Sequence, residues 1–64
     1  MTQKELLYVE DAIGHEKSII SIIQNSLKDL TDEELTNFLE GEITKHTETK
    51  ERLINLLEVN SNGQ

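Results

Sequence analysis

The stretch Leu30-Thr31-Asp32-Glu33-Glu34-Leu35 separates two long apolar repeats in this sequence. Thr31 followed by Glu34 is typical of a capping box, in which two side chains satisfy backbone N–H groups at the start of a helix. The three carboxylates at 32–34 would lie at the positive end of that helix, where negative charge is favourable. One helix therefore ends before this stretch, near Asp29, and a second helix begins within it.

Apolar side chains recur at steps of three and four residues through the first half of the chain. Such steps place them along one face of an α-helix, which turns by about 100° per residue. Thr2 and Glu5 repeat the capping-box pattern at the start of this half. A first helix is therefore expected over about 3–29. Its apolar seam consists of Leu6, Val9, Ile13, Ile20, Ile23 and Leu27.

A second helix is expected over about 32–58, because the same steps continue and the chain contains no proline. Its seam follows the steps of four and three through Leu35, Leu39, Glu42, His46, Thr49, Leu53 and Leu56, with Phe38 beside it. Residues 59–64 are expected to form a disordered tail, since their last five side chains include nothing apolar. Gly14 and Gly41 lie away from both seams, and the pattern assigns them no role.

A turn of only a few residues forces two long helices into an antiparallel hairpin. A chain of 64 residues buries only about 60% of the surface that its unfolded form exposes, and this chain has no cysteine for a disulfide. One neighbouring helix also cannot cover an apolar arc wider than about 100°. The predicted fold class is therefore all-α: an antiparallel two-helix hairpin that dimerises into a four-helix bundle.

A polar layer interrupts the middle of the predicted seam at Glu16, Glu42 and His46. Counted from the turn, the three residues lie at about the same height, and a buried carboxylate needs a partner. The layer is interpreted either as Glu–His hydrogen bonds that fix the register of the helices or as ligands for iron, manganese or zinc. The Glu-x-x-x-His spacing differs from the Glu-x-x-His of di-iron bundles, and the metal hypothesis is the alternative.

Composition excludes several classes of function. The formal net charge of −7 and the scarcity of aromatic residues oppose binding to nucleic acid or to an anionic membrane surface. No apolar run reaches the roughly 18 residues that a membrane span needs, and the start of the chain lacks the pattern of a signal peptide. Ser18 and Ser21 have no base at helical spacing, so the sequence predicts no catalytic residue and no enzyme activity.

Several short motifs resemble those of a known family. The chain is similar to the spore coat protein F-like proteins of endospore-forming bacteria, which are ferritin-like helical proteins, over roughly Gln3 to Leu57. The resemblance is carried by Glu5-Leu6-Leu7, Asp11-x-x-x-His15-Glu16-Lys17, Leu30-Thr31-Asp32-x-Glu34-Leu35 and Lys45-His46.

The resemblance implies that Glu16 corresponds to the glutamate of the first ferritin-like helix. It would place the family's Glu-x-x-His at His46-Thr47-Glu48-Thr49, where this chain departs from the motif, so Glu42 replaces the lost ligand or the site is vestigial. The resulting hypothesis is a small, non-enzymatic, self-associating structural protein, cytoplasmic or spore-associated, with no cofactor. The alternatives are a metal-binding bundle and a regulatory module that binds a partner helix.

Overall fold

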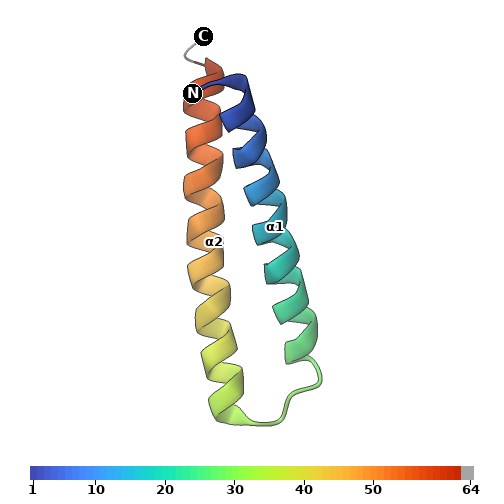
Figure 1. Ribbon diagram of the computed structural model, residues 1–64. Helices are drawn as coiled ribbons and strands as arrows, with labels where there is room; N and C mark the ends of the chain where they lie inside the picture. Colours follow the sequence, from blue (N-terminus) through green and yellow to red (C-terminus); the bar gives the residue numbers. More distant parts are fainter. Residues whose placement is uncertain (63–64) are drawn as a thin grey trace.

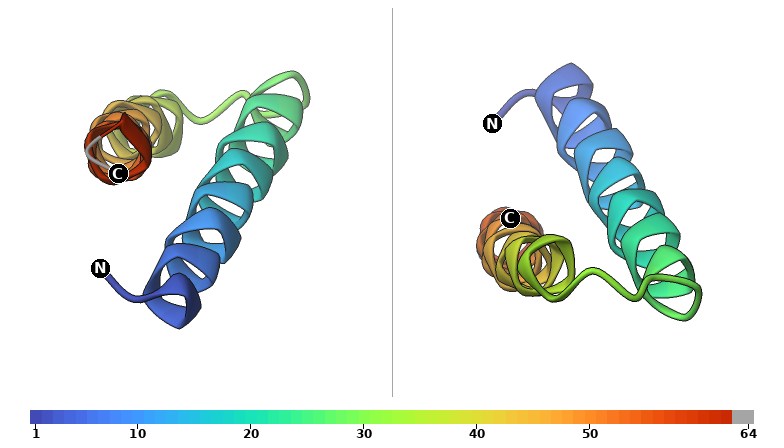
Figure 2. Two further views of the ribbon diagram at one scale, coloured as in Figure 1. Left: turned by 90° about the horizontal axis from the view of Figure 1, so that it is seen from above. Right: turned by 90° about the horizontal axis from the view of Figure 1, so that it is seen from below.

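The protein is a hairpin of two antiparallel helices joined by a short turn (Figure 1). The computed structural model describes residues 1–62, with side chains described to Asn60. Helix α1 spans Gln3–Leu27 and helix α2 spans Glu33–Asn62, and the hairpin is 49 Å long. Seen along its length, α1 runs obliquely to α2 (Figure 2). The predicted all-α antiparallel hairpin is confirmed.

Neither helix in this part of the chain has an apolar stretch long enough to cross a membrane.

Helix α1 begins at the predicted capping box. The backbone N–H of Glu5 donates to the Thr2 hydroxyl over 3.1 Å, and the backbone N–H of Thr2 donates to the Glu5 carboxylate over 2.7 Å. Both hydrogen bonds satisfy donors that have no partner within the helix. These bonds also lower the pKa of the Glu5 carboxyl below its usual 4.5, with the backbone bond from Thr2 as the main cause.

The turn is capped by a different residue from the one expected. The backbone N–H of Leu35 donates to the Asp32 carboxylate over 2.9 Å, so Asp32 is the N-terminal cap of α2. The predicted Thr31–Glu34 box is replaced by this bond, which an ionised carboxylate accepts more strongly than a hydroxyl does. At the other side of the turn, α1 ends at Leu27, and the N–H groups of Asp29 and Leu30 donate back to its last carbonyls.

Helix α2 extends beyond its predicted end. The sequence suggests an end at residue 58 and a disordered tail over 59–64, but α2 continues to Asn62. Asn60 gives part of the physical reason, because its side-chain amide donates to the Leu56 carbonyl over 2.8 Å and its Oδ1 accepts from the Met1 ammonium over 3.3 Å. Asparagine is a poor helix former in isolation, and these contacts offset that preference. Residues 63–64 of the predicted tail lie outside the described residues.

The side chains between the helices form a narrow core. Ile13 is 7% exposed, and it is the one buried residue among the side chains described. The remaining residues between the helices are half-buried. On α1 they are Leu6, Val9, Glu16, Ile20, Ile23 and Leu27; on α2 they are Leu39, Ile43, His46, Lys50, Leu53, Leu57 and Asn60. Together with Ile13 these residues are called the inner rows.

Candidate functional site

The centre of the inner rows holds one polar pair. The Nδ1 atom of His46 lies 2.5 Å from an oxygen of the Glu16 carboxylate, and the side chains are 31% and 17% exposed, respectively. An ionised carboxylate can only accept hydrogen bonds, so with Glu16 ionised the contact is a hydrogen bond in the tautomer that carries its proton on Nδ1 of His46. The pair joins the two helices at mid-length and satisfies a carboxylate that sits within an otherwise apolar seam. It has the geometry of the predicted Glu–His hydrogen bond.

Glu42 belongs to a different part of the surface. It is half-buried, but the structure gives it no hydrogen bond to Glu16 or His46. Within residues 1–62, no three Asp, Glu, His or Cys side chains gather closely enough to hold a metal ion. Glu16 and His46 therefore offer a possible ion two protein ligands in one chain, where a structural zinc site takes four.

The predicted self-association seam divides between two surfaces. Most of its members lie in the inner rows and are already covered by the other helix of the same chain. These members are Leu6, Val9, Ile13, Ile20, Ile23, Leu27, Leu39 and Leu53. The remaining three, Leu35, Phe38 and Leu56, are 43%, 61% and 47% exposed. The exposed members of the seam are therefore free to contact a second molecule.

These exposed residues belong to a second row along α2. The row follows steps of three and four residues, and it lies roughly a quarter-turn from the inner row at about 100° per residue. It consists of Leu35, Phe38, Glu42, Lys45, Thr49, Arg52, Leu56 and Val59. Val59 is 68% exposed, so both ends of the row present large apolar side chains.

Helix α1 carries a matching second row at the same steps. It consists of Tyr8, Ala12, His15, Ile19, Ile22 and Ser26. Ile22 is 64% exposed and Tyr8 is 61% exposed, while Lys4 places its ammonium 5.9 Å from the centre of the Tyr8 ring. A two-helix hairpin leaves Ile19 and Ile22 exposed to water, although isoleucine is usually buried inside proteins.

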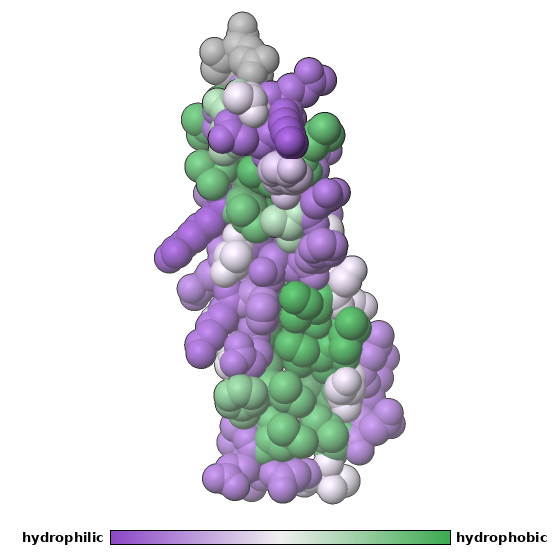
Figure 3. All heavy atoms as spheres, in the orientation of Figure 1, coloured by the Kyte–Doolittle hydropathy of each residue, from purple (hydrophilic) through white to green (hydrophobic). Residues whose placement is uncertain are grey.

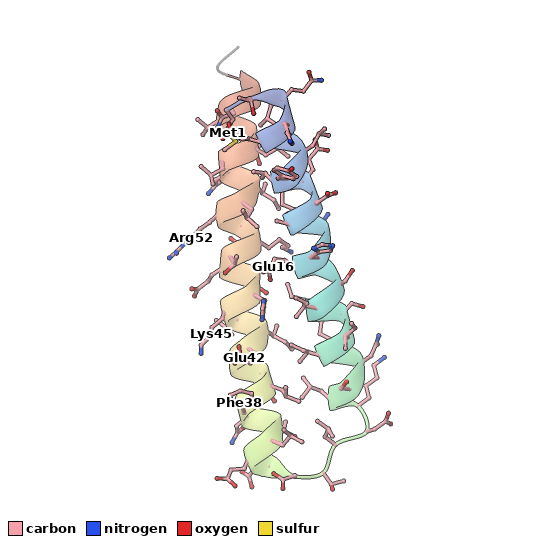
Figure 4. All side chains as sticks on the ribbon, viewed as in Figure 1. Met1, Glu16, Phe38, Glu42, Lys45 and Arg52 are labelled. Carbon is pink, nitrogen blue, oxygen red and sulfur yellow. The ribbon has the colours of Figure 1, made fainter. Side chains whose placement is uncertain are left out.

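Both second rows lie on one side of the hairpin, here called the outer face. Figure 3 shows an apolar patch that covers both helices near the turn, a second apolar area near the termini, and a polar band between them. The patch near the turn contains Ile19, Ile22, Leu35 and Phe38. Figure 4 shows Phe38, Lys45 and Arg52 following one another along α2. The outer face is therefore apolar at both ends and charged in the middle.

A shallow hollow marks the end of the outer face near the termini. It is lined by Arg52, Asn55, Leu56 and Val59. Its apolar floor is open to solvent, so it could receive one large apolar side chain from another molecule. Within one chain, the exposed ring of Phe38 lies near the opposite end of α2 and cannot reach it.

Sequence reasoning missed part of this surface. It placed Val59 in the tail and did not count Tyr8, Ile19 and Ile22 among the associating residues. The steps of three and four that pass through these residues were the available signal. That signal is masked because two adjacent rows on one helix merge into a single wide apolar arc.

Comparison of the chain with known family models, curated proteins and solved structures found no match.

Proposed function

We propose that this chain is a small, non-enzymatic structural protein that works by self-association, and that its functional unit is a homodimer closed through the outer face. The observation that supports the proposal is the coverage of apolar side chains. Only Ile13 is buried among the side chains described, while nine large apolar residues are exposed. A two-helix hairpin of this size cannot build a sufficient core alone, and a second hairpin completes a four-helix bundle.

The arrangement of the exposed residues favours association over random exposure. Apolar patches of this kind, bordered by polar side chains, mark association surfaces in soluble proteins. The patch near the turn joins residues from both helices, as expected for a surface that faces another pair of helices (Figure 3). The spore-related role implied by the family resemblance stays a prediction, and it rests on the quoted motifs alone.

Analytical ultracentrifugation tests the proposal. We expect a dimer at micromolar concentration, with a melting temperature that rises with protein concentration because dissociation accompanies unfolding. Ile22→Lys should raise the dissociation constant by on the order of 100-fold, because it places a charge in an apolar contact.

Leu7→Lys provides the matched control. Leu7 is 57% exposed on the same helix, but its heptad position continues through Gly14 and Ser21 and lies outside the outer face. It should leave the dimer intact. A wild-type chain that stays monomeric at every concentration would contradict the proposal and would favour the alternative, a module that binds a partner helix.

A further inference from the structure

The order of residues along the outer face also specifies how two copies would meet. The Glu16–His46 contact sets the register between the helices, so that His15 is level with Thr47. Along α2, the members of the outer face form pairs at equal distances on either side of Thr47. The pairs are Leu35 with Val59, Phe38 with Leu56, Glu42 with Arg52, and Lys45 with Thr49.

The row on α1 has its centre close to the same height. Its six members pair about Lys17, as Tyr8 with Ser26, Ala12 with Ile22 and His15 with Ile19, and Lys17 lies two residues from His15. A two-fold axis at the height of Thr47 therefore pairs the whole row on α2 and passes within two residues of the centre of the row on α1. The pairing along α2 supports one arrangement of the dimer.

From this symmetry, and resting on the proposed homodimer, we infer that the partner of the outer face is a second copy whose turn lies at the opposite end of the bundle. Helix α2 then packs against α2 of the partner in antiparallel orientation, and α1 against its own copy. The interchain contacts are Phe38 with Leu56 and Glu42 with Arg52, each occurring twice by symmetry.

Charge distinguishes this arrangement from the other two-fold dimer. If the turns were at the same end, α2 would face the partner's α1, and Glu42 would lie at the height of Ile20, beside Ile19 of the outer face, with no cation of that face opposite. Lys45 would then lie at the height of Lys17, between His15 and Ile19, instead of opposite Thr49. With the turns at opposite ends, Glu42 meets Arg52, and the Thr49 hydroxyl, which donates to the Lys45 carbonyl of its own helix over 3.1 Å, is a neutral neighbour for the other lysine.

Shape agrees with charge. The hollow lined by Arg52, Leu56 and Val59 lies where the partner's Phe38 would arrive. An aromatic ring there would contact Leu56 and lie beside the Arg52 guanidinium, a favourable position for a cation next to a π-system. With the turns at the same end, the neighbours of this hollow would come from the start of α1, and Phe38 would lie far from it (Figure 4).

A pair of charge reversals tests the Glu42–Arg52 contact. Glu42→Arg alone and Arg52→Glu alone each create two like-charge contacts in the homodimer, and each should raise its dissociation constant by roughly tenfold or more. Mixed together, the two variants should form a heterodimer in large excess over the statistical mixture, as measured by native mass spectrometry. Salt should reduce that excess, because it screens exposed charges.

Glu51→Arg is the matched control for Glu42→Arg. It makes the same change of charge on the same helix, but Glu51 is exposed on a heptad position outside the outer face. Mixing it with Arg52→Glu should give no preference for the heterodimer. Equal preferences with Glu42→Arg and Glu51→Arg would overturn the inferred contact, because the effect would then follow net charge alone.

A distance between turns tests the orientation directly. The chain has no cysteine, so Asp29→Cys carries a single spin label in the turn. With the turns at opposite ends, the two labels of a dimer should be separated by a distance comparable to the 49 Å length of the hairpin. A dimer with a separation on the order of 20 Å, as in helices packed side by side, would overturn the inferred orientation. That result would leave the proposed self-association standing, whereas a monomer in sedimentation would contradict both.

Discussion

The inner rows and the outer face use similar residues but leave them in different environments. In the inner rows, most side chains along both helices are apolar, and the polar pair at their centre, Glu16 with His46, is joined within the chain. On the outer face, apolar side chains are confined to the two ends. Among the described residues, Glu42, Lys45 and Arg52 in its middle take part in no ion pair. The difference shows that the hairpin covers one set of apolar side chains by itself and leaves the other set exposed.

Truncating an isoleucine on each surface should give the largest contrast. Ile13→Ala should lower the free energy of unfolding by about 2–4 kcal/mol, because it removes packed atoms from the only buried position described. Ile22→Ala, the same change at a 64% exposed position, should act mainly through dimerisation. Chemical denaturation at two protein concentrations separates the effects. The contrast fails if the loss from Ile22→Ala is independent of concentration and equals that from Ile13→Ala.

The Glu16–His46 pair allows a sharper test of the inner rows. Glu16→Leu should destabilise the fold by about 1 kcal/mol, because it leaves a half-buried imidazole without its partner. The double variant Glu16→Leu with His46→Leu should recover that loss or exceed wild-type stability, since apolar replacement of both partners is often neutral or stabilising. Thermal denaturation of the wild type, both single variants and the double variant measures the coupling. Additive effects would show that the contact contributes nothing to stability.

The glycines probe the surface opposite the inner rows. A Cβ atom added at Gly14 would meet nothing within 4 Å, and the same holds at Gly41. Each substitution by alanine should therefore stabilise its helix by about 0.5–1 kcal/mol through backbone entropy alone. Melting temperatures measured at one protein concentration check this. A loss of stability at either site would reveal a third surface in close contact with another molecule.

The capping box gives a small dependence of stability on pH. The pKa of Glu5 is lower in the folded chain than its usual 4.5, so the ionised carboxylate stabilises α1 at pH values above about 4.5. This contribution is lost as the pH falls through the lowered pKa. Glu5→Gln should therefore fray the start of α1 at pH 7 and differ little from wild type in strong acid. Amide hydrogen exchange of the first turn at both pH values measures this fraying. A difference between Glu5→Gln and wild type that persists in acid would show that the fraying does not come from the loss of the Glu5 charge.

The smallest expected effect is that of added metal. Metal-free protein titrated with Fe²⁺, Mn²⁺ or Zn²⁺ should keep its melting temperature, because one chain brings only Glu16 and His46 together. A rise that disappears in His46→Ala would instead support the metal-binding alternative and would place ligands from a second copy at the polar layer.

The hairpin could be predicted because the turn, the caps and the steps of three and four are local features. The distribution of α2 residues between two surfaces could not. The predicted seam on α2 takes its residues alternately from the two rows: Leu35, Glu42, Thr49 and Leu56 from the outer face, and Leu39, His46 and Leu53 from the inner row. Periodicity locates the centre of an apolar arc, but α2 turns only one edge of that arc, the inner row, towards α1.

The polar layer was predicted more completely than the end of α2. Counting residues from the turn correctly places Glu16 and His46 at the same height. The same count gives Glu42 a similar height, but Glu42 belongs to the outer face of α2 and not to its inner row. The end of α2 is held partly by Asn60, whose contact with the Met1 ammonium joins the two ends of the chain and arises only in the folded hairpin. Contacts between residues far apart in the sequence cannot be predicted from the helix propensity of each residue.

The hydrogen bond between the Met1 ammonium and Asn60 has a practical consequence for anything attached to this protein. It brings the first residue beside the last turns of α2, so a fused domain at either terminus would leave from the same pole of the hairpin (Figure 1). In the inferred dimer, whose two turns lie at opposite ends, each end would then present the termini of one copy. Two attached cargoes would be held apart by about the 49 Å length of the hairpin, which would make the assembly a spacer with a defined span.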